Sequence, residues 1–137
     1  MDLVLASLNR YNMMSTQPRI AIVLDPWERE TFLPPEVIRE LESISTDLHS
    51  VEPGSLDGAT AWIDWLAETA PEILVSAWMT PALPEDTLER VPELKYVCHL
   101  AGSVKGTVSD GLLEQGLLVS NWGNSVARTV AECGLML

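Results

Sequence analysis

The chain has 137 residues, of which 47% are hydrophobic, and carries a formal net charge of −12. A single domain of this length buries roughly two-thirds of the surface of its unfolded chain. The acidic charge argues against a nucleic-acid-binding surface, which needs a basic patch or stripe. No stretch of about 18 residues is free of charge, which argues against a membrane-spanning helix. These properties predict an acidic cytoplasmic protein with no nucleic-acid or membrane partner.

Hydrophobic patterning predicts strands and helices that alternate along the chain. Continuous apolar runs predict strands buried on both faces of a parallel sheet, and apolar residues spaced three to four apart predict amphipathic helices. In chain order, the expected elements are a strand at 20–24, a helix at 34–44, a weak strand at 48–51, a helix at 62–70, a strand at 73–78, a short helix at 84–91, a strand at 94–100, a short helix at 108–113, a strand at 117–120 and a final helix at 125–137. Such repeats imply right-handed crossovers. The predicted fold is a flavodoxin-like α/β sandwich of three layers with a five-stranded parallel sheet.

The two ends of the chain differ from its middle. Residues 1–17 lack a basic segment followed by a long apolar run, so they do not resemble a secretory signal. We expect them to form a flexible leader that precedes a folded domain at 18–120. The final helix reaches Leu137 with no polar cap and no glycine after it.

Three predicted strand ends carry sequences suited to a binding site, because ligands of open α/β sheets bind outside the carboxyl ends of the strands. They are Trp78-Met79-Thr80-Pro81, Ala101-Gly102-Ser103-Val104-Lys105-Gly106 and Asn121-Trp122-Gly123-Asn124. Glycines allow backbone amides to face an anion, so the amides of Ser103 and Val104 are candidates to hold a carboxylate. An ordinary turn in which Gly102 and Gly106 adopt a positive φ explains the glycines equally well.

The sequence contains no recognised catalytic motif. Neither GxGxxG nor GxxxxGK[S/T] occurs, so these 137 residues encode no phosphate-binding nucleotide loop. His99 lies in an apolar run, which favours a core histidine with satisfied hydrogen bonds over a general base. Cys98 and Cys133 do not have the spacing of zinc ligands and are expected to be buried, reduced thiols. Glu132 is expected to form a salt bridge or cap within its helix, so no catalytic residue and no metal ligand is assigned.

Four segments occur in a definite order with definite separations. They are Leu83-Pro-Glu-Asp-Thr-Leu-Glu-Arg-Val-Pro-Glu-Leu-Lys-Tyr-Val, Ala101-Gly-Ser-Val, Gly116-Leu-Leu-Val-Ser-Asn and Thr129-Val-Ala-Glu. Over 20–137, this arrangement resembles the N-terminal region of D-isomer-specific 2-hydroxyacid dehydrogenases. The resemblance implies a two-domain enzyme that uses NAD or NADP to interconvert a small 2-keto acid and a D-2-hydroxy acid.

The resemblance also implies roles for individual residues. The loop at 102–104 would hold the substrate carboxylate through its main-chain amides. The substrate-binding positions would be Trp78, Met79, Gly102, Ser103, Val104 and Asn124, and the cofactor-contacting positions would be Ser103 and Val130. Trp78 and Leu100 stand where phosphoglycerate-type members place arginines, which disfavours a phosphorylated substrate.

Several parts of such an enzyme are expected beyond these residues. In the family, the glycine-rich nucleotide loop and the catalytic arginine, glutamate and histidine follow the position of Leu137. The segment 121–137 would begin a helix that crosses to a Rossmann domain, the parent enzyme would be a homodimer, and the chain alone would be inactive. The alternative is a stand-alone flavodoxin-like module that binds a small ligand or regulates without catalysis. A phosphoryl-accepting receiver is excluded because residues 76–78 include no aspartate.

Overall fold

A computed structural model of the chain describes residues 17–45 and 47–136. Its elements are β1 (Arg19–Val23), α2 (Pro26–Phe32), α3 (Pro35–Ile44), β2 (Asp47–Val51), the 3₁₀ turn η1 (Pro53–Ser55), α4 (Gly58–Thr69), β3 (Ile73–Ser76), α5 (Thr87–Arg90), β4 (Tyr96–His99), α6 (Asp110–Glu114), β5 (Leu118–Ser120) and α7 (Ala127–Met136). The leader expected over 1–17 lies outside the described residues except for Gln17, and Leu137 also lies outside them.

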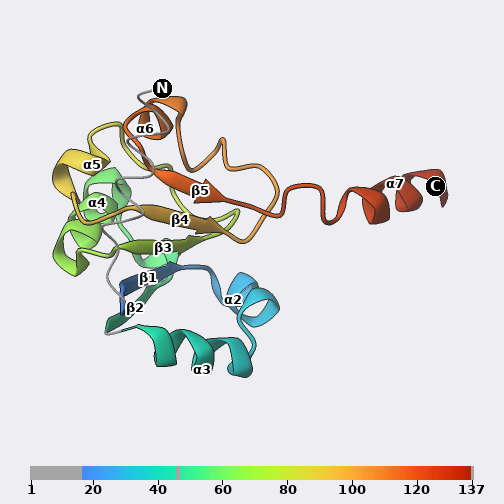
Figure 1. Cartoon of the computed structure of the whole chain (residues 1–137), viewed down its shortest axis with the longest axis horizontal. Helices are drawn as coiled ribbons and strands as arrows, with labels where there is room; N and C mark the ends of the chain where they lie inside the picture. Colours follow the sequence, from blue (N-terminus) through green and yellow to red (C-terminus); the bar gives the residue numbers. More distant parts are fainter. Residues whose placement is uncertain (1–16, 46, 137) are drawn as a thin grey trace.

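The five strands form one sheet in the order β2-β1-β3-β4-β5, and every neighbouring pair is parallel. This order is the flavodoxin-like one, in which the chain switches direction across the sheet between β1 and β3. The predicted fold is therefore confirmed. The strands all point toward the side of the molecule on which α2 and α7 lie (Figure 1).

Two apolar clusters cover the two faces of the sheet. Successive residues of β1 alternate between them: Ile20 and Ile22 belong to one cluster, and Ala21 and Val23 belong to the other. The first cluster continues into α2 and α3, with Phe32, Val37, Ile38 and Leu41. The second continues into α4, α5 and α6, with Trp62, Ile63, Leu66, Leu88 and Leu112. The molecule therefore has three layers, with the central strands buried on both faces.

Sequence patterning did not predict helix α2. It is seven residues long, too short to show a hydrophobic period, and it begins with a capping box. The Asp25 side chain accepts a hydrogen bond from the Glu28 amide at 2.7 Å, and the Glu28 side chain accepts one from the Asp25 amide at 3.1 Å. Pro26 occupies the first turn, where its missing N–H is not needed. The signal was thus present in Asp25-Pro26-Trp27-Glu28.

Helix α7 differs from the expected final helix in its start and in its burial. It begins at Ala127 rather than 125, and none of its residues is buried. It stands away from the sheet, joined to β5 by an extended segment (Figure 1). Cys133 is consequently exposed, so its predicted burial is wrong, whereas Cys98 is partly buried. The predicted salt bridge of Glu132 is confirmed, since its carboxylate lies 2.8 Å from Nε of Arg128.

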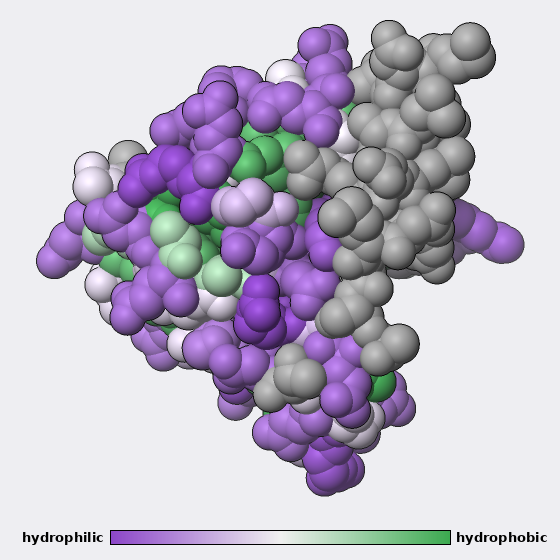
Figure 2. Space-filling model, turned by 60° about the vertical axis from the view of Figure 1, so that its left-hand side comes forward, coloured by the Kyte–Doolittle hydropathy of each residue, from purple (hydrophilic) through white to green (hydrophobic). Residues whose placement is uncertain are grey.

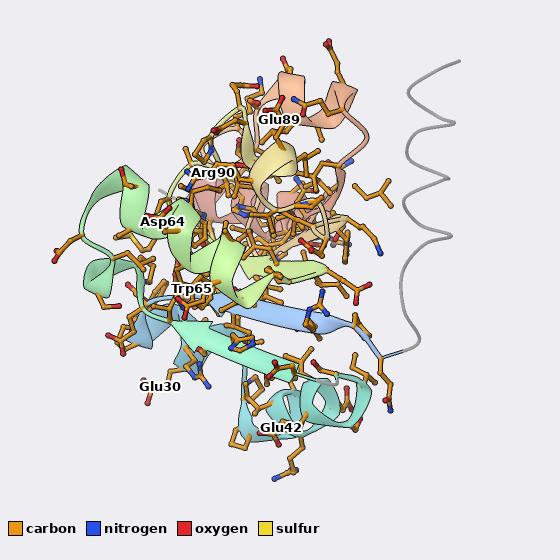
Figure 3. All side chains as sticks on the ribbon, turned by 90° about the vertical axis from the view of Figure 1, so that its left-hand side faces the viewer. Glu30, Glu42, Asp64, Trp65, Glu89 and Arg90 are labelled. Carbon is orange, nitrogen blue, oxygen red and sulfur yellow. The ribbon has the colours of Figure 1, made fainter. Side chains whose placement is uncertain are left out.

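The outer surface is mainly hydrophilic on the face shown in Figure 2, with smaller apolar areas between the polar groups. On α4 and α5, Asp64 and Arg90 form an ion pair, and Figure 3 shows the two residues side by side. Both side chains are partly solvated, so this pair contributes little to stability. None of the described helices is long and apolar enough to cross a membrane.

The burial of β3 can be tested by shortening one side chain. Leu74 is 0% exposed, and Leu74→Ala is expected to lower the free energy of unfolding by about 2–5 kcal/mol, because it leaves a cavity between sheet and helices. Leu135 on α7 is 88% exposed, and Leu135→Ala is the matched control, with an expected change below about 0.5 kcal/mol. Urea denaturation followed by circular dichroism measures both. Equal losses in the two variants would contradict the assigned core.

Candidate functional site

The candidate site lies at the edge of the sheet where the strands end. All the strands are parallel, so the segments that follow β1, β3, β4 and β5 meet at this one edge. In Figure 1 these segments are α2, the start of the β3–α5 connection, the β4–α6 loop and the start of the β5–α7 connection. The three strand ends predicted from the sequence are therefore on the same side of the molecule.

A buried carboxylate joins the segments that follow β1 and β3. Glu28 of α2 is fully buried. One of its oxygens accepts the hydrogen bond from Asp25 within the capping box, and the other accepts a hydrogen bond from the Met79 amide at 2.9 Å. Both oxygens thus receive backbone donors, which compensates for the loss of water around the charge. Sequence reasoning missed Glu28, although its place three residues after Asp25 was a signal.

Thr80 makes a second connection between the ends of β1 and β3. Its side chain is buried, its hydroxyl donates to the Val23 carbonyl at 2.8 Å, and it accepts from the Ala77 amide at 2.9 Å. With Glu28, it holds both sides of the Trp78–Met79 turn. The side chains of Trp78 and Met79 remain 50% and 57% exposed, so the turn presents them to solvent on a rigid support.

Four aromatic rings meet above this edge, and we call them the aromatic cluster: Trp27 and Phe32 of α2, Trp78 after β3, and Trp122 after β5. Ring centroids are 5.9 Å apart for Trp27 and Trp78, 5.4 Å for Phe32 and Trp78, and 5.6 Å for Trp122 with both Phe32 and Trp78. These separations fall within the range of favourable aromatic pairs. The sequence placed Trp78 and Trp122 at two of the strand ends suited to a binding site, whereas Trp27 and Phe32 were missed together with α2.

The glycine loop after β4 is held by the segment that follows β5. The Trp122 amide donates to the Ala101 carbonyl at 3.1 Å, and the Asn121 side-chain amide donates to the Gly102 carbonyl. Both bonds use carbonyl groups of the loop. The amides of Ser103 and Val104 donate to no residue in the described parts of the chain. The loop therefore presents two adjacent amide donors that its own fold does not use.

The glycines of this loop are not explained by backbone conformation. Positive φ angles among described glycines occur at Gly58, Gly116 and Gly123, and not at Gly102 or Gly106. A Cβ atom added at Gly102 or Gly106 would meet nothing within 4 Å. The explanation by a turn with positive φ is therefore wrong for both positions, and neither conformation nor packing within the chain requires glycine there.

His99 ends β4 just before this loop and is 3% exposed. Its Nδ1 atom lies 2.9 Å from the Ser76 hydroxyl, but its Nε2 atom has no hydrogen-bond partner among the described residues. The prediction of a core histidine holds for its burial and for Nδ1, whereas Nε2 lacks the expected partner among the described residues. Burial lowers the pKa of His99 below its usual 6.5, while a backbone group of Ser103 and the Glu28 charge act in the opposite direction.

Two of the predicted site residues lie outside this group of contacts. Asn124 is exposed, and its backbone carbonyl accepts from the Ala127 amide at 3.1 Å. The contact with the glycine loop comes from Asn121 instead, which sequence reasoning missed. Val130 is 65% exposed on α7, which stands apart from the sheet (Figure 1).

Within 17–45 and 47–136, no three His, Cys, Asp or Glu side chains are grouped so as to hold a metal ion.

The architecture of this chain is similar to that of solved structures of other proteins. No protein-family model and no curated protein matches the sequence. An acyclic imino acid reductase, solved in complex with NADPH and D-arginine, matches with a TM-score of 0.65 and 21% identity over 87% of this chain and 35% of its own. A phosphoglycerate oxidoreductase from Rhizobium etli matches with a TM-score of 0.60 and 19% identity over 85% of this chain and 34% of its own. A 2-hydroxyacid dehydrogenase from Ketogulonicigenium vulgare matches with a TM-score of 0.55 and 16% identity over 88% of this chain and 34% of its own.

These neighbours are proteins of the D-2-hydroxyacid dehydrogenase family. The chain shares their fold. It spans about a third of the length of each neighbour (35%, 34% and 34%). At identities of 21% or less, the likeness concerns the fold alone.

Removing the buried carboxylate should destabilise the edge of the sheet. Glu28→Ala leaves the amides of Asp25 and Met79 without an acceptor, and we expect it to lower the free energy of unfolding by about 3 kcal/mol. Glu30→Ala, at an exposed position of the same helix, is the matched control and should change stability by less than about 0.5 kcal/mol. Urea denaturation measures both variants. A loss for Glu28→Ala no larger than for Glu30→Ala would contradict the linking role.

The buried histidine should make stability depend on pH. The folded pKa of His99 is lowered, so the unfolded chain takes up the proton first as the pH falls. We therefore expect the free energy of unfolding to decrease from about pH 7.5 to about pH 5.5, and His99→Gln to remove that part of the decrease. His49→Gln, on edge strand β2, is the control and should retain it. An NMR titration in which the His99 ring protonates at or above pH 6.5 would contradict the lowered pKa.

Proposed function

We propose that this chain is the substrate-binding domain of an NAD(P)-dependent dehydrogenase that interconverts a small 2-keto acid and a D-2-hydroxy acid. The observation that carries the proposal is the loop at 102–104, whose Ser103 and Val104 amides donate to no described residue. Consecutive backbone amides of this kind form anion sites in proteins. Their position at the carboxyl edge of a flavodoxin-like sheet is where such folds bind ligands.

The free space at Gly102 supports a ligand at this loop. Because no atom of the described residues lies within 4 Å of an added Cβ there, a glycine leaves room for close approach of a carboxylate from outside. Asn121 would position the loop through its bond to the Gly102 carbonyl. Trp78 and Met79 would form the wall beside the substrate carbonyl, and Asn124 would lie at the rim.

The cofactor would meet this chain on its exposed side. NAD or NADP, when bound, supplies or accepts the hydride. Ser103 and Val130 are both exposed, so both are free to contact a nicotinamide ring, but the sequence contains no glycine-rich loop for the pyrophosphate. A cation to polarise the carbonyl and an acid to deliver the proton are also required. Since His99 is buried and is not at the surface of the loop, we expect these 137 residues alone to bind substrate without turning it over.

The descriptions of two fold neighbours support a dehydrogenase of this general type. One was solved with NADPH and D-arginine, and another is described as a 2-hydroxyacid dehydrogenase. A stand-alone module that binds a small ligand is the second candidate, because the amide donors and the aromatic cluster are complete within this chain. Both candidates predict that this chain alone binds the substrate. Only the dehydrogenase also reduces the substrate, and for that it needs a nucleotide-binding domain.

The proposal can be tested by NMR on the 15N-labelled 137-residue chain. Titration with pyruvate is expected to shift the amide signals of Ser103 and Val104 with a dissociation constant on the order of millimolar, as suits a few hydrogen bonds near the surface. Methyl pyruvate, which has no carboxylate, is the matched control and should leave these signals in place. NADH should show no tight binding. Signals at 103 and 104 that do not respond to pyruvate, or respond equally to its ester, would contradict a carboxylate site.

A further inference from the structure

We propose that the aromatic cluster recognises an aromatic side chain on the 2-keto acid, so that the substrate class is an arylpyruvate; this inference rests on the proposed function. The cluster consists of Trp27, Phe32, Trp78 and Trp122, whose contacting rings have centroids 5.4–5.9 Å apart. Trp27 and Trp78 remain 59% and 50% exposed in spite of these contacts. Large apolar rings exposed side by side are typical of a binding surface.

The cluster and the amide loop are parts of one structural unit. Trp122 supplies one ring of the cluster, while its own amide holds the Ala101 carbonyl at 3.1 Å. Its neighbour Asn121 holds Gly102. A ligand carboxylate at Ser103 and Val104 is therefore adjacent to the segment that presents the Trp122 ring. On this inference, an acid bound through the loop places an apolar side chain beside the rings.

The rings are held in place from below by buried hydrogen bonds. Trp78 lies in the turn that Glu28 and Thr80 fix to α2 and β1. Trp27 and Phe32 belong to α2, whose start is fixed by the capping box. A surface whose rings are already ordered loses little side-chain entropy when a ligand binds. The cluster is thus preorganised for a planar group.

The charges near the cluster favour an aromatic group over a charged one. Glu28 is the buried acid at this edge, and both of its oxygens already accept backbone hydrogen bonds. A cationic side chain would therefore find no free Glu28 oxygen with which to form an ion pair. Arg29 of α2 bonds to Ser50 on β2, and the chain carries a net charge of −12, which disfavours a second carboxylate on the ligand. The interplanar angles of 71° for Phe32 with Trp122 and 87° for Trp78 with Trp122 are those of edge-to-face packing, which an added aryl ring can extend.

The test compares phenylpyruvate with pyruvate on the complete 137-residue chain by NMR. We expect phenylpyruvate to bind about 10-fold more tightly, the equivalent of one to two aromatic contacts, and to shift tryptophan indole signals together with the amides of Ser103 and Val104. In Trp27→Leu, the ratio of the two affinities should fall toward one, and Trp27→Phe should restore most of it. Trp65→Leu is the matched control, since Trp65 stacks on Trp62 of the same helix, and it should keep the ratio.

The outcomes separate this inference from the proposed function. If both acids shift the loop amides with equal affinity, the aromatic preference is wrong and the carboxylate site stands. If neither acid shifts them, the proposed function itself fails. Phenylpyruvate that shifts the indoles but not the loop amides would overturn the inference, because the acid would then not be bound through the loop. Tighter binding of 2-keto-5-guanidinopentanoate than of phenylpyruvate would also overturn it, in favour of a cationic substrate.

Discussion

The arrangement of this molecule depends on the burial of β1 and β3 on both faces of the sheet. The strands here are parallel, and parallel strands are joined by helices that cross over the sheet and cover both of its faces. Their carboxyl ends then lie along one edge, and the connecting segments bring residues from distant parts of the sequence together there. In β1, apolar side chains are buried on both faces: Ile20 and Ile22 on one face, and Ala21 and Val23 on the other. The site exists at that edge because the packing leaves the connecting segments no other place to meet.

Glu28 shows how local and tertiary requirements are combined at one side chain. As the third residue of α2 it completes a capping box, which is a local function. Its second oxygen binds the Met79 amide, 51 residues away. The carboxylate therefore aligns the helix that carries Trp27 and Phe32 with the turn that carries Trp78. The relative position of Trp27, Phe32 and Trp78 therefore depends on this buried carboxylate as well as on the contacts between the rings.

The site combines a polar and an apolar part with different origins. The polar part is the pair of amides at Ser103 and Val104. Asn121 and the Trp122 backbone bind carbonyl groups of the loop, so they do not occupy these amides. The apolar part is the aromatic cluster. Helix α7 belongs to neither, since none of its residues is buried and Val130 faces solvent. This division fits the substrate-binding role proposed for the chain.

Much of this could be read from the sequence alone. The apolar runs and the helical periodicity determined the alternation of strands and helices, the parallel sheet and the loop at 102–104, because burial on two faces leaves a local pattern. Only the tertiary structure decided which side chains meet. It placed Asn121 rather than Asn124 on the glycine loop and showed that Gly102 does not adopt a positive φ. It also left Nε2 of His99 without a partner among the described residues and exposed Cys133. Contacts such as those of Trp78 with Phe32 and Trp122 depend on how crossovers bring distant segments together at the sheet edge, and no local pattern records that.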